Sequence, residues 1–189
     1  MIYKNELAPN SPYTMVWDDS SAENVPSSEN LVPKEIVEEC LCLYPNNQKH
    51  LETFVYCTGQ LTATLLPHDI EYSTIIVDYY TASQFVLTAS QMSYVLAGCV
   101  FFDPLIPVLP ECLYPTYLDY LRAGRLYYTD LILRLRKMTS NRIPQKVTMR
   151  VMSIIHRRGL YLMTSRLFLP DRNGYIDVST VMSTGGETL

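Results

Sequence analysis

One continuous segment, residues 79–98, constrains the fold of this chain more than any other. Its sequence, YYTASQFVLTASQMSYVLAG, is long enough for a helix of several turns, and its apolar residues fall on nearly every side of that helix. Thr81, followed three residues later by Gln84, predicts a capping box at the start, and Gly98 predicts the end. Such a helix is enclosed by protein, so the rest of the chain must supply a shell around it.

The same segment carries polar side chains that a buried helix does not need. Ser90 and Tyr94 lie one turn apart, beside a stripe that recurs at intervals of three or four residues: Thr81, Gln84, Thr88 and Gln91. Buried hydroxyls and amides must be hydrogen-bonded. These groups therefore either cap neighbouring strands or form part of a functional site, and both interpretations stay open at this point.

Most of the remaining sequence predicts strands. Residues 51–66 are β-branched, aromatic and rich in Thr, which predicts a strand bent around Gly59. Further strands are expected at residues 73–77, 131–136, 146–151, 160–169 and 175–182, the last two as a hairpin around the turn DRNG. Short helices are expected at residues 33–44 and 116–127, and four prolines in residues 101–115 predict an irregular connection or lid.

A long helix followed by an antiparallel meander is the plan of a hotdog domain, an α+β fold in which the sheet wraps around a central helix. We expect a polar N-terminal arm at residues 1–30, a single hotdog domain at residues 31–183 and a flexible tail at residues 184–189. Hotdog proteins usually dimerise and bind acyl thioesters beside the central helix. A homodimer or higher homo-oligomer is therefore expected.

Composition and motifs exclude several classes of protein. No apolar run reaches the ~18 residues of a membrane span, and the first residues do not have the pattern of a secretory signal, so a cytoplasmic location and no membrane partner are expected. The five cysteines form no CxxC pair, and the three histidines are too far apart in the sequence for a zinc ligand set. The nucleophile motif GxSxG, the phosphate-binding motifs and HExxH are absent.

Charge is divided unevenly along the chain. Residues 1–119 hold three of the fifteen Lys and Arg and fifteen of the nineteen Asp and Glu, a net charge of −12, whereas residues 120–189 have a net charge of +8. The division marks an interaction face or an internal pairing of the two halves. Nucleic acid is not expected as a partner, because the basic residues form no recognisable binding motif.

The predicted central helix offers unusual chemistry. It carries no ionisable residue other than Tyr94, and Asp78 just before it is the nearest carboxylate. Asp78 is either a catalytic group or a complement to the helix dipole. The neutral hydroxyls and amides of the helix suit polarising a thioester carbonyl and orienting a water molecule or an amine.

Three stretches resemble the FcoT-type fatty acyl-CoA thioesterase family, hotdog proteins that lack the usual catalytic acid. They are YYTASQFVLTASQMSY, RLRKMTSNRIPQK and the YP that ends the first helix, and the similarity spans residues 36–181. The resemblance implies that tyrosine and amide side chains do the work of an acid, with catalytic roles for Tyr44, Tyr72, Thr81, Ser90 and Tyr94. Thr81 and Ser90 replace asparagines of the family's hydrolase, and Ser73 takes the place of Tyr72 in a register shifted by one.

The function implied is hydrolysis of fatty acyl thioesters of coenzyme A or acyl carrier protein, in lipid or natural-product biosynthesis. No cofactor is expected beyond the coenzyme A or phosphopantetheine of the substrate, which Gln84 and Gln91 would help to bind. An alternative is addition of an amine such as glycine to an α,β-unsaturated acyl thioester, giving a β-amino fatty acid, with Arg134 and Arg136 binding the carboxylate. These arginines also fit a solvated strand face, and a non-catalytic acyl-binding protein is the second alternative.

Overall fold

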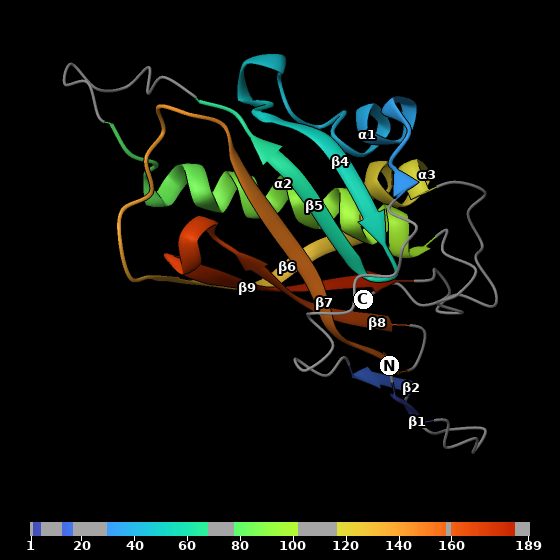
Figure 1. Ribbon diagram of the computed structural model, residues 1–189. Coiled ribbons are helices and arrows are strands. Elements are labelled where there is room, and N and C mark those ends of the chain that lie inside the picture. The colour runs from blue at the N-terminus through green and yellow to red at the C-terminus, as the bar shows by residue number, and fades with distance from the viewer. Residues whose placement is uncertain are drawn as a thin grey trace.

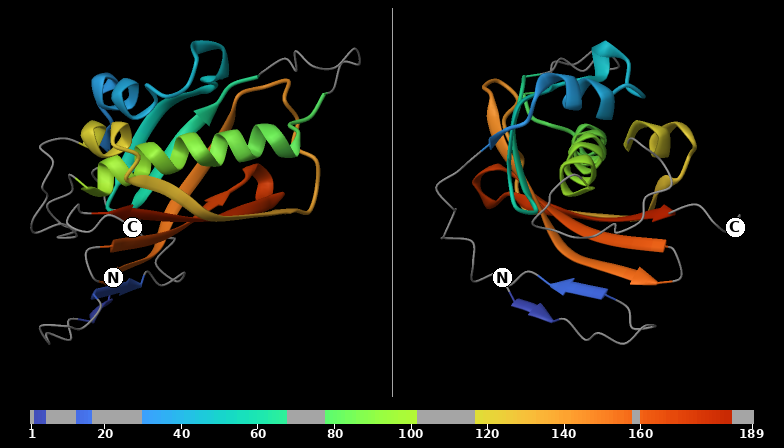
Figure 2. Two further views of the ribbon diagram at one scale, coloured as in Figure 1. Left: turned by 180° about the vertical axis from the view of Figure 1, so that it is seen from behind. Right: turned by 90° about the vertical axis from the view of Figure 1, so that its right-hand side faces the viewer.

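An antiparallel sheet wraps around one long helix, which confirms the expected hotdog fold (Figures 1 and 2). The computed structural model describes residues 2–4, 13–16, 30–67, 78–101, 117–157 and 160–183. The central helix is α2 (Ala82–Phe101). Two short helices, α1 (Lys34–Cys40) and α3 (Tyr117–Arg122), lie beside it, and α1 packs against it.

The described residues form one sheet of nine strands. The order along the main path is β3-β4-β5-β7-β8-β9-β6. The strands on this path are β3 (Asn30–Leu31), β4 (Leu51–Cys57), β5 (Gln60–Leu65), β6 (Leu126–Leu135), β7 (Gln145–Arg157), β8 (Leu160–Phe168) and β9 (Gly174–Ser183). The other two, β1 (Ile2–Lys4) and β2 (Tyr13–Val16), form a hairpin that pairs with the second half of β7. The segment expected as a polar arm therefore includes two short strands.

The capping box at the start of α2 is confirmed. The backbone N–H of Thr81 donates to Gln84 Oε1 at 2.8 Å, and the N–H of Gln84 donates to Thr81 Oγ1 at 3.3 Å. The prediction that Gly98 ends the helix is wrong, because α2 continues to Phe101. Ala97 and Val100 on either side of Gly98 are buried, so packing against the shell outweighs the low helix propensity of glycine.

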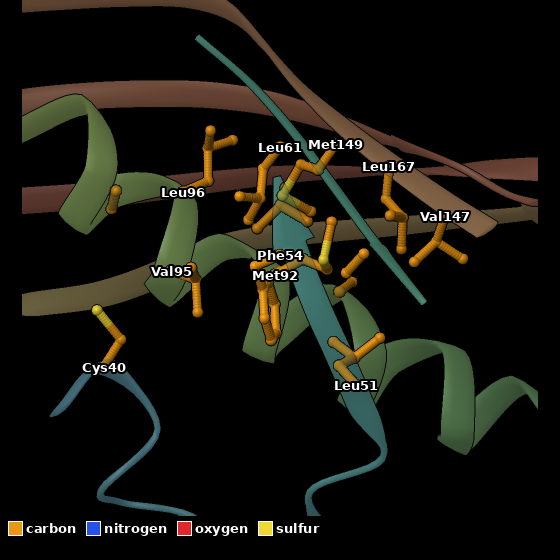
Figure 3. Close-up of a cluster of buried hydrophobic side chains, with 14 of the residues drawn as sticks. Cys40, Leu51, Phe54, Leu61, Met92, Val95, Leu96, Val147, Met149 and Leu167 are labelled. Carbon is orange, nitrogen blue, oxygen red and sulfur yellow. The ribbon is translucent and has the colours of Figure 1, made fainter. Parts of the chain in front are cut away.

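The core lies between α2 and the concave face of the sheet. Met92, Val95 and Leu96 of the helix are fully buried and face apolar side chains of β4, β5, β7 and β8 (Figure 3). Burial alternates strictly along β8 and β9, as expected for strands with one wet face. One stripe of α2 escapes this enclosure: Ala82, Ser83 and Val86 are exposed, and Ser90 and Tyr94 are half-buried.

Several predicted elements have different bounds in the structure. Residues 51–66 are not one bent strand but the hairpin β4–β5, because positive φ angles at Thr58 and Gly59 reverse the chain there. The first helix ends at Cys40, and the helix expected at residues 116–127 ends at Arg122, after which β6 begins. The hairpin β8–β9 is confirmed, with a 3-10 turn, η3 (Pro170–Arg172), between its strands.

Some expectations fall on residues that the structure does not describe. These are the short strand at residues 73–77, most of the connection at residues 101–115 and the tail at residues 184–189. The domain boundaries stay predictions. None of the helices in the described ranges is both long enough and apolar enough to cross a membrane.

Candidate functional site

Three hydroxyl groups meet where the exposed stripe of α2 faces α1 and β6. The Tyr44 hydroxyl is hydrogen-bonded to Ser90 Oγ. Ser90 Oγ donates to the Tyr128 hydroxyl at 3.0 Å, and that hydroxyl donates to the backbone carbonyl of Ser90 at 2.8 Å. Each hydroxyl has a single proton. Because Ser90 uses its proton on Tyr128, Tyr44 must be the donor in the first bond, and the chain of donors runs Tyr44, Ser90, Tyr128.

Tyr94 completes this group, which we name the hydroxyl cluster (Tyr44, Ser90, Tyr94 and Tyr128). Its ring packs edge-on against Tyr44, with centroids 5.9 Å apart, and against Tyr128, with centroids 5.4 Å apart. Edge-to-face contacts of this kind fix the orientation of each ring. The cluster therefore combines the three predicted residues Tyr44, Ser90 and Tyr94 with Tyr128, which the sequence did not indicate.

Local backbone features position Tyr44 and Tyr128. The N–H of Tyr44 donates to the carbonyl of Leu41 at 3.1 Å, which turns the chain back toward α2 after α1 ends. On β6, the pairing with β9 shifts between Tyr128 and Asp130, so Thr129 is an extra residue. This bulge allows Tyr128 and Leu131 to share the inner face although they are three positions apart. Tyr128 pairs with the buried Thr180, which confirms its inward direction.

Burial keeps the tyrosines protonated. Desolvation raises the pKa of Tyr44 to about 12, and the neighbouring Tyr94 adds to the rise while the bond to Ser90 opposes it. Burial also raises the pKa of Tyr128, with smaller contributions from Tyr44 and Tyr94. Both hydroxyls are therefore neutral hydrogen-bond donors at neutral pH. Their chemistry is that of donors to a developing negative charge, not that of bases.

A second polar group lies beside the cluster in the protein interior. Gln91 is fully buried, and its amide nitrogen donates to the Gln48 carbonyl at 2.7 Å. That carbonyl also accepts from His50 Nδ1 at 2.8 Å, so Nδ1 carries a proton, and His50 Nε2 lies 3.0 Å from Thr88 Oγ1. Gln91 Oε1 has no hydrogen-bond partner among the described residues. The sequence presented His50 only as an isolated histidine, because its partners are far away along the chain.

The other predicted site residues lie elsewhere. Thr81 and Gln84 bond to each other at the start of α2, and Thr81 precedes Ser90 by nine residues, about 14 Å along the helix. Arg134 is exposed and follows the inward-facing Leu133, so it projects from the opposite face of the sheet. Arg136 is exposed just after β6. Tyr72 is outside the described residues, and its role stays a prediction.

The Asp78 side chain lies at the protein surface. Its carboxylate forms an ion pair with Arg142, and this hydrogen bond holds the pKa of Asp78 below its usual range. The carboxylate is thus ionised and engaged at the start of α2, away from the hydroxyl cluster. Among the residues described, no group of three or more His, Cys, Asp or Glu side chains is placed to hold a metal ion.

Comparisons with known proteins give similarity in structure alone. No family model matches the sequence, and no curated protein matches it. A mutant of thioesterase PA1618 from Pseudomonas aeruginosa aligns at 10% identity and a TM-score of 0.49, over 82% of this chain and 96% of that one. Cj0977, a sigma28-regulated virulence protein from Campylobacter jejuni, aligns at 6% identity and a TM-score of 0.48, over 81% and 90%.

A third solved structure is a hypothetical thioesterase from Streptococcus pneumoniae with coenzyme A. It aligns at 11% identity and a TM-score of 0.42, over 82% of this chain and 98% of that one. Similarity at this level identifies neither a substrate nor a reaction. A functional conclusion must therefore rest on the site itself.

Proposed function

We propose that this protein hydrolyses fatty acyl thioesters at the hydroxyl cluster. The observation that carries the proposal is the directed chain from Tyr44 through Ser90 to Tyr128, on the one stripe of the central helix that reaches the surface. Tyr44 and Ser90 lie beside each other in this chain, and each uses its single proton on the next member. When a thioester binds, both hydroxyls exchange these internal bonds for hydrogen bonds to the carbonyl oxygen, while the Tyr128 hydroxyl stays bonded to the Ser90 carbonyl.

The reaction needs little else from the protein. Water adds to the carbonyl carbon, and negative charge develops on the oxygen, where the Tyr44 and Ser90 hydroxyls stabilise it. The carbon–sulfur bond then breaks, and the sulfur leaves as a thiolate while the water proton passes to solvent. Because a thiol has a pKa of about 8.5, this leaving group requires no strong acid, which fits a cluster without a carboxylate. Tyr128 positions Ser90 through the hydrogen bond from its hydroxyl to the Ser90 backbone carbonyl.

The position of Arg134 favours hydrolysis over amine addition. Amine addition requires a cation near the reacting carbon to bind the amino acid's carboxylate, but Arg134 lies on the outer face of the sheet within this chain. The test is incubation of the protein with saturated and 2-enoyl thioesters of N-acetylcysteamine, with and without glycine, followed by mass spectrometry. Hydrolysis predicts free fatty acid in every arm. A glycine adduct would support amine addition, and binding without turnover would support an acyl-binding protein.

Conservative variants locate the site. Tyr44→Phe and Ser90→Ala each remove one donor and should lower kcat by about ten- to a thousandfold, with the melting temperature within a few degrees of wild type. Tyr127→Phe is the matched control, because Tyr127 precedes Tyr128 and faces the opposite side of β6. Unchanged turnover in both cluster variants would exclude the cluster as the site even if the protein is a thioesterase.

We also propose that the active form is a homodimer that pairs along β6. This strand is the last of the sheet order and pairs with β9 alone among the described strands. It is ten residues long and exposes Ile132 on its outer face. A long strand edge that no described strand pairs with is a template for pairing with a second copy.

A further inference from the structure

The segment of residues 134–146, RLRKMTSNRIPQK, is a strongly basic part of the surface. It holds Arg134, Arg136, Lys137, Arg142 and Lys146, and no acidic residue. All five are exposed, and Asp78, paired with Arg142, is the carboxylate bonded to the segment. Three large apolar side chains stand among these cations: Leu135 is 45% exposed, Met138 is 73% exposed and Ile143 is 60% exposed. Apolar side chains exposed among cations are typical of a protein interface.

The segment is held in place by the rest of the fold. Thr139 is buried, its hydroxyl accepts from Asn173 Nδ2 at 3.1 Å, and its carbonyl accepts from the N–H of Tyr80 at 2.9 Å. The N–H of Asn141 donates to the carbonyl of Asp78 at 3.2 Å. Met138 and Ile143 are thus presented by an anchored backbone, which lowers the entropy lost when a partner binds.

The segment also lies at the N-terminal end of the central helix. It curves past the start of α2 (Figure 1), where its Thr139 and Ser140 pair with Tyr80 and Tyr79. From there the exposed stripe of α2 leads through Val86 to Ser90, over about 14 Å. A thioester on a flexible arm, carried by a partner docked on this segment, would extend along the stripe to the hydroxyl cluster.

We propose that residues 134–146 dock an acidic acyl carrier protein that delivers the acyl thioester to the hydroxyl cluster. This inference rests on the proposed function, because the docked carrier protein would deliver the substrate of that reaction. Binding of the carrier protein can nevertheless be measured without turnover. Charge complementarity selects an acidic partner. Free coenzyme A would use the cations but leave Met138 and Ile143 without a role. A membrane surface is disfavoured because Thr139, Ser140 and Asn141 interrupt the apolar side chains, whereas membrane-surface segments present a continuous apolar face.

The test measures binding of a fluorescent acyl carrier protein with an octanoyl thioester, by anisotropy, to wild type and to a Lys137→Glu, Lys146→Glu double variant. Neither lysine forms an ion pair within the described chain. The double variant should raise Kd by at least about tenfold, and moderate salt should weaken wild-type binding similarly. Met138→Ser should weaken binding without changing its salt dependence. Lys34→Glu, on the exposed surface of α1, is the control and should bind as wild type.

Each other outcome overturns the docking proposal. Equal Kd values for wild type and the double variant would place any docking elsewhere, and no binding by wild type would exclude it. Tighter binding to vesicles of anionic lipid than to the carrier protein would assign the segment to a membrane. A lower oligomeric state in the double variant would assign it to contact between copies. Failure of the proposed function is recognised separately, because wild type would then hydrolyse neither the carrier-bound thioester nor the N-acetylcysteamine thioester.

Discussion

At the scale of single residues, the hydroxyl cluster is a polar group without a charged side chain. Tyr44, Ser90 and Tyr128 satisfy one another in a fixed direction, so each proton position is determined by the geometry. Burial makes ionisation of the tyrosines unfavourable, which preserves them as donors. Under the proposed function, a substrate carbonyl takes over the protons of Tyr44 and Ser90 from these internal bonds.

The raised tyrosine pKa values predict how stability depends on pH. Below the ordinary value of 10.0, Tyr44 is protonated in both the folded and the unfolded chain, and its contribution to stability is fully present. As the pH rises from 10.0 to about 12, the unfolded chain ionises first, so the free energy of unfolding should fall. Denaturant titrations across this range measure the fall. A Tyr44→Phe, Tyr128→Phe double variant should show a smaller decrease, and an identical decrease would contradict the assignment.

At the scale of the elements, the start of α2 depends on its capping box. Thr81→Ala removes the side chain that accepts from the N–H of Gln84 and should lower the free energy of unfolding by about 1 kcal/mol. Denaturant unfolding measures the loss, and Val86→Ala, at an exposed position of the same helix outside the cap, is the control. Because Thr81 bonds within its own helix end, we expect kcat to change less than about twofold. A large loss of kcat at normal stability would instead support the catalytic role predicted for Thr81.

The join between β6 and β9 leaves no room for a side chain at Gly174. A Cβ atom there would lie 2.2 Å from the carbonyl oxygen of Arg134, and that oxygen belongs to backbone that cannot move aside freely. Gly174→Ala should therefore lower the free energy of unfolding by about 2 kcal/mol. Gly124→Ala is the comparison, because Gly124 has a φ of +65° but no atom within 4 Å of the added Cβ. Gly124→Ala should lower the free energy of unfolding by only about 1 kcal/mol. A larger loss for Gly124→Ala than for Gly174→Ala would contradict the close contact at Gly174.

At the scale of the whole molecule, the edge of β6 that pairs with no other described strand predicts the oligomeric state. Ile132 is 42% exposed there. In a dimer that pairs along β6, a Lys at this position would lose the apolar contacts of Ile132 or would face a like charge of the second copy. Ile132→Lys should raise the dimer dissociation constant by at least about tenfold, as measured by sedimentation. Leu43→Lys is the control, since Leu43 is 54% exposed and follows α1 instead of lying on β6. A monomeric wild type would contradict the edge pairing.

The sequence alone determined the central helix, its capping box, the antiparallel meander and therefore the fold class. These features follow from local signals, namely apolar periodicity, capping residues and turn residues, which act over a few positions. The same periodicity placed Ser90 and Tyr94 on one face of the helix, and the family resemblance added Tyr44.

Tertiary structure alone decided how those residues meet. Tyr128 joins Ser90 from 38 positions away because a bulge at Thr129 changes which side chains of β6 face inward, and no local pattern shows where a bulge will form. Gly98 remains helical because buried neighbours outweigh its propensity. Two further placements have the same cause: His50 is hydrogen-bonded to Thr88, and the Arg134 side chain faces away from the hydroxyl cluster. Strand register and helix packing decide which side chains share a face, and both are set by contacts between distant segments.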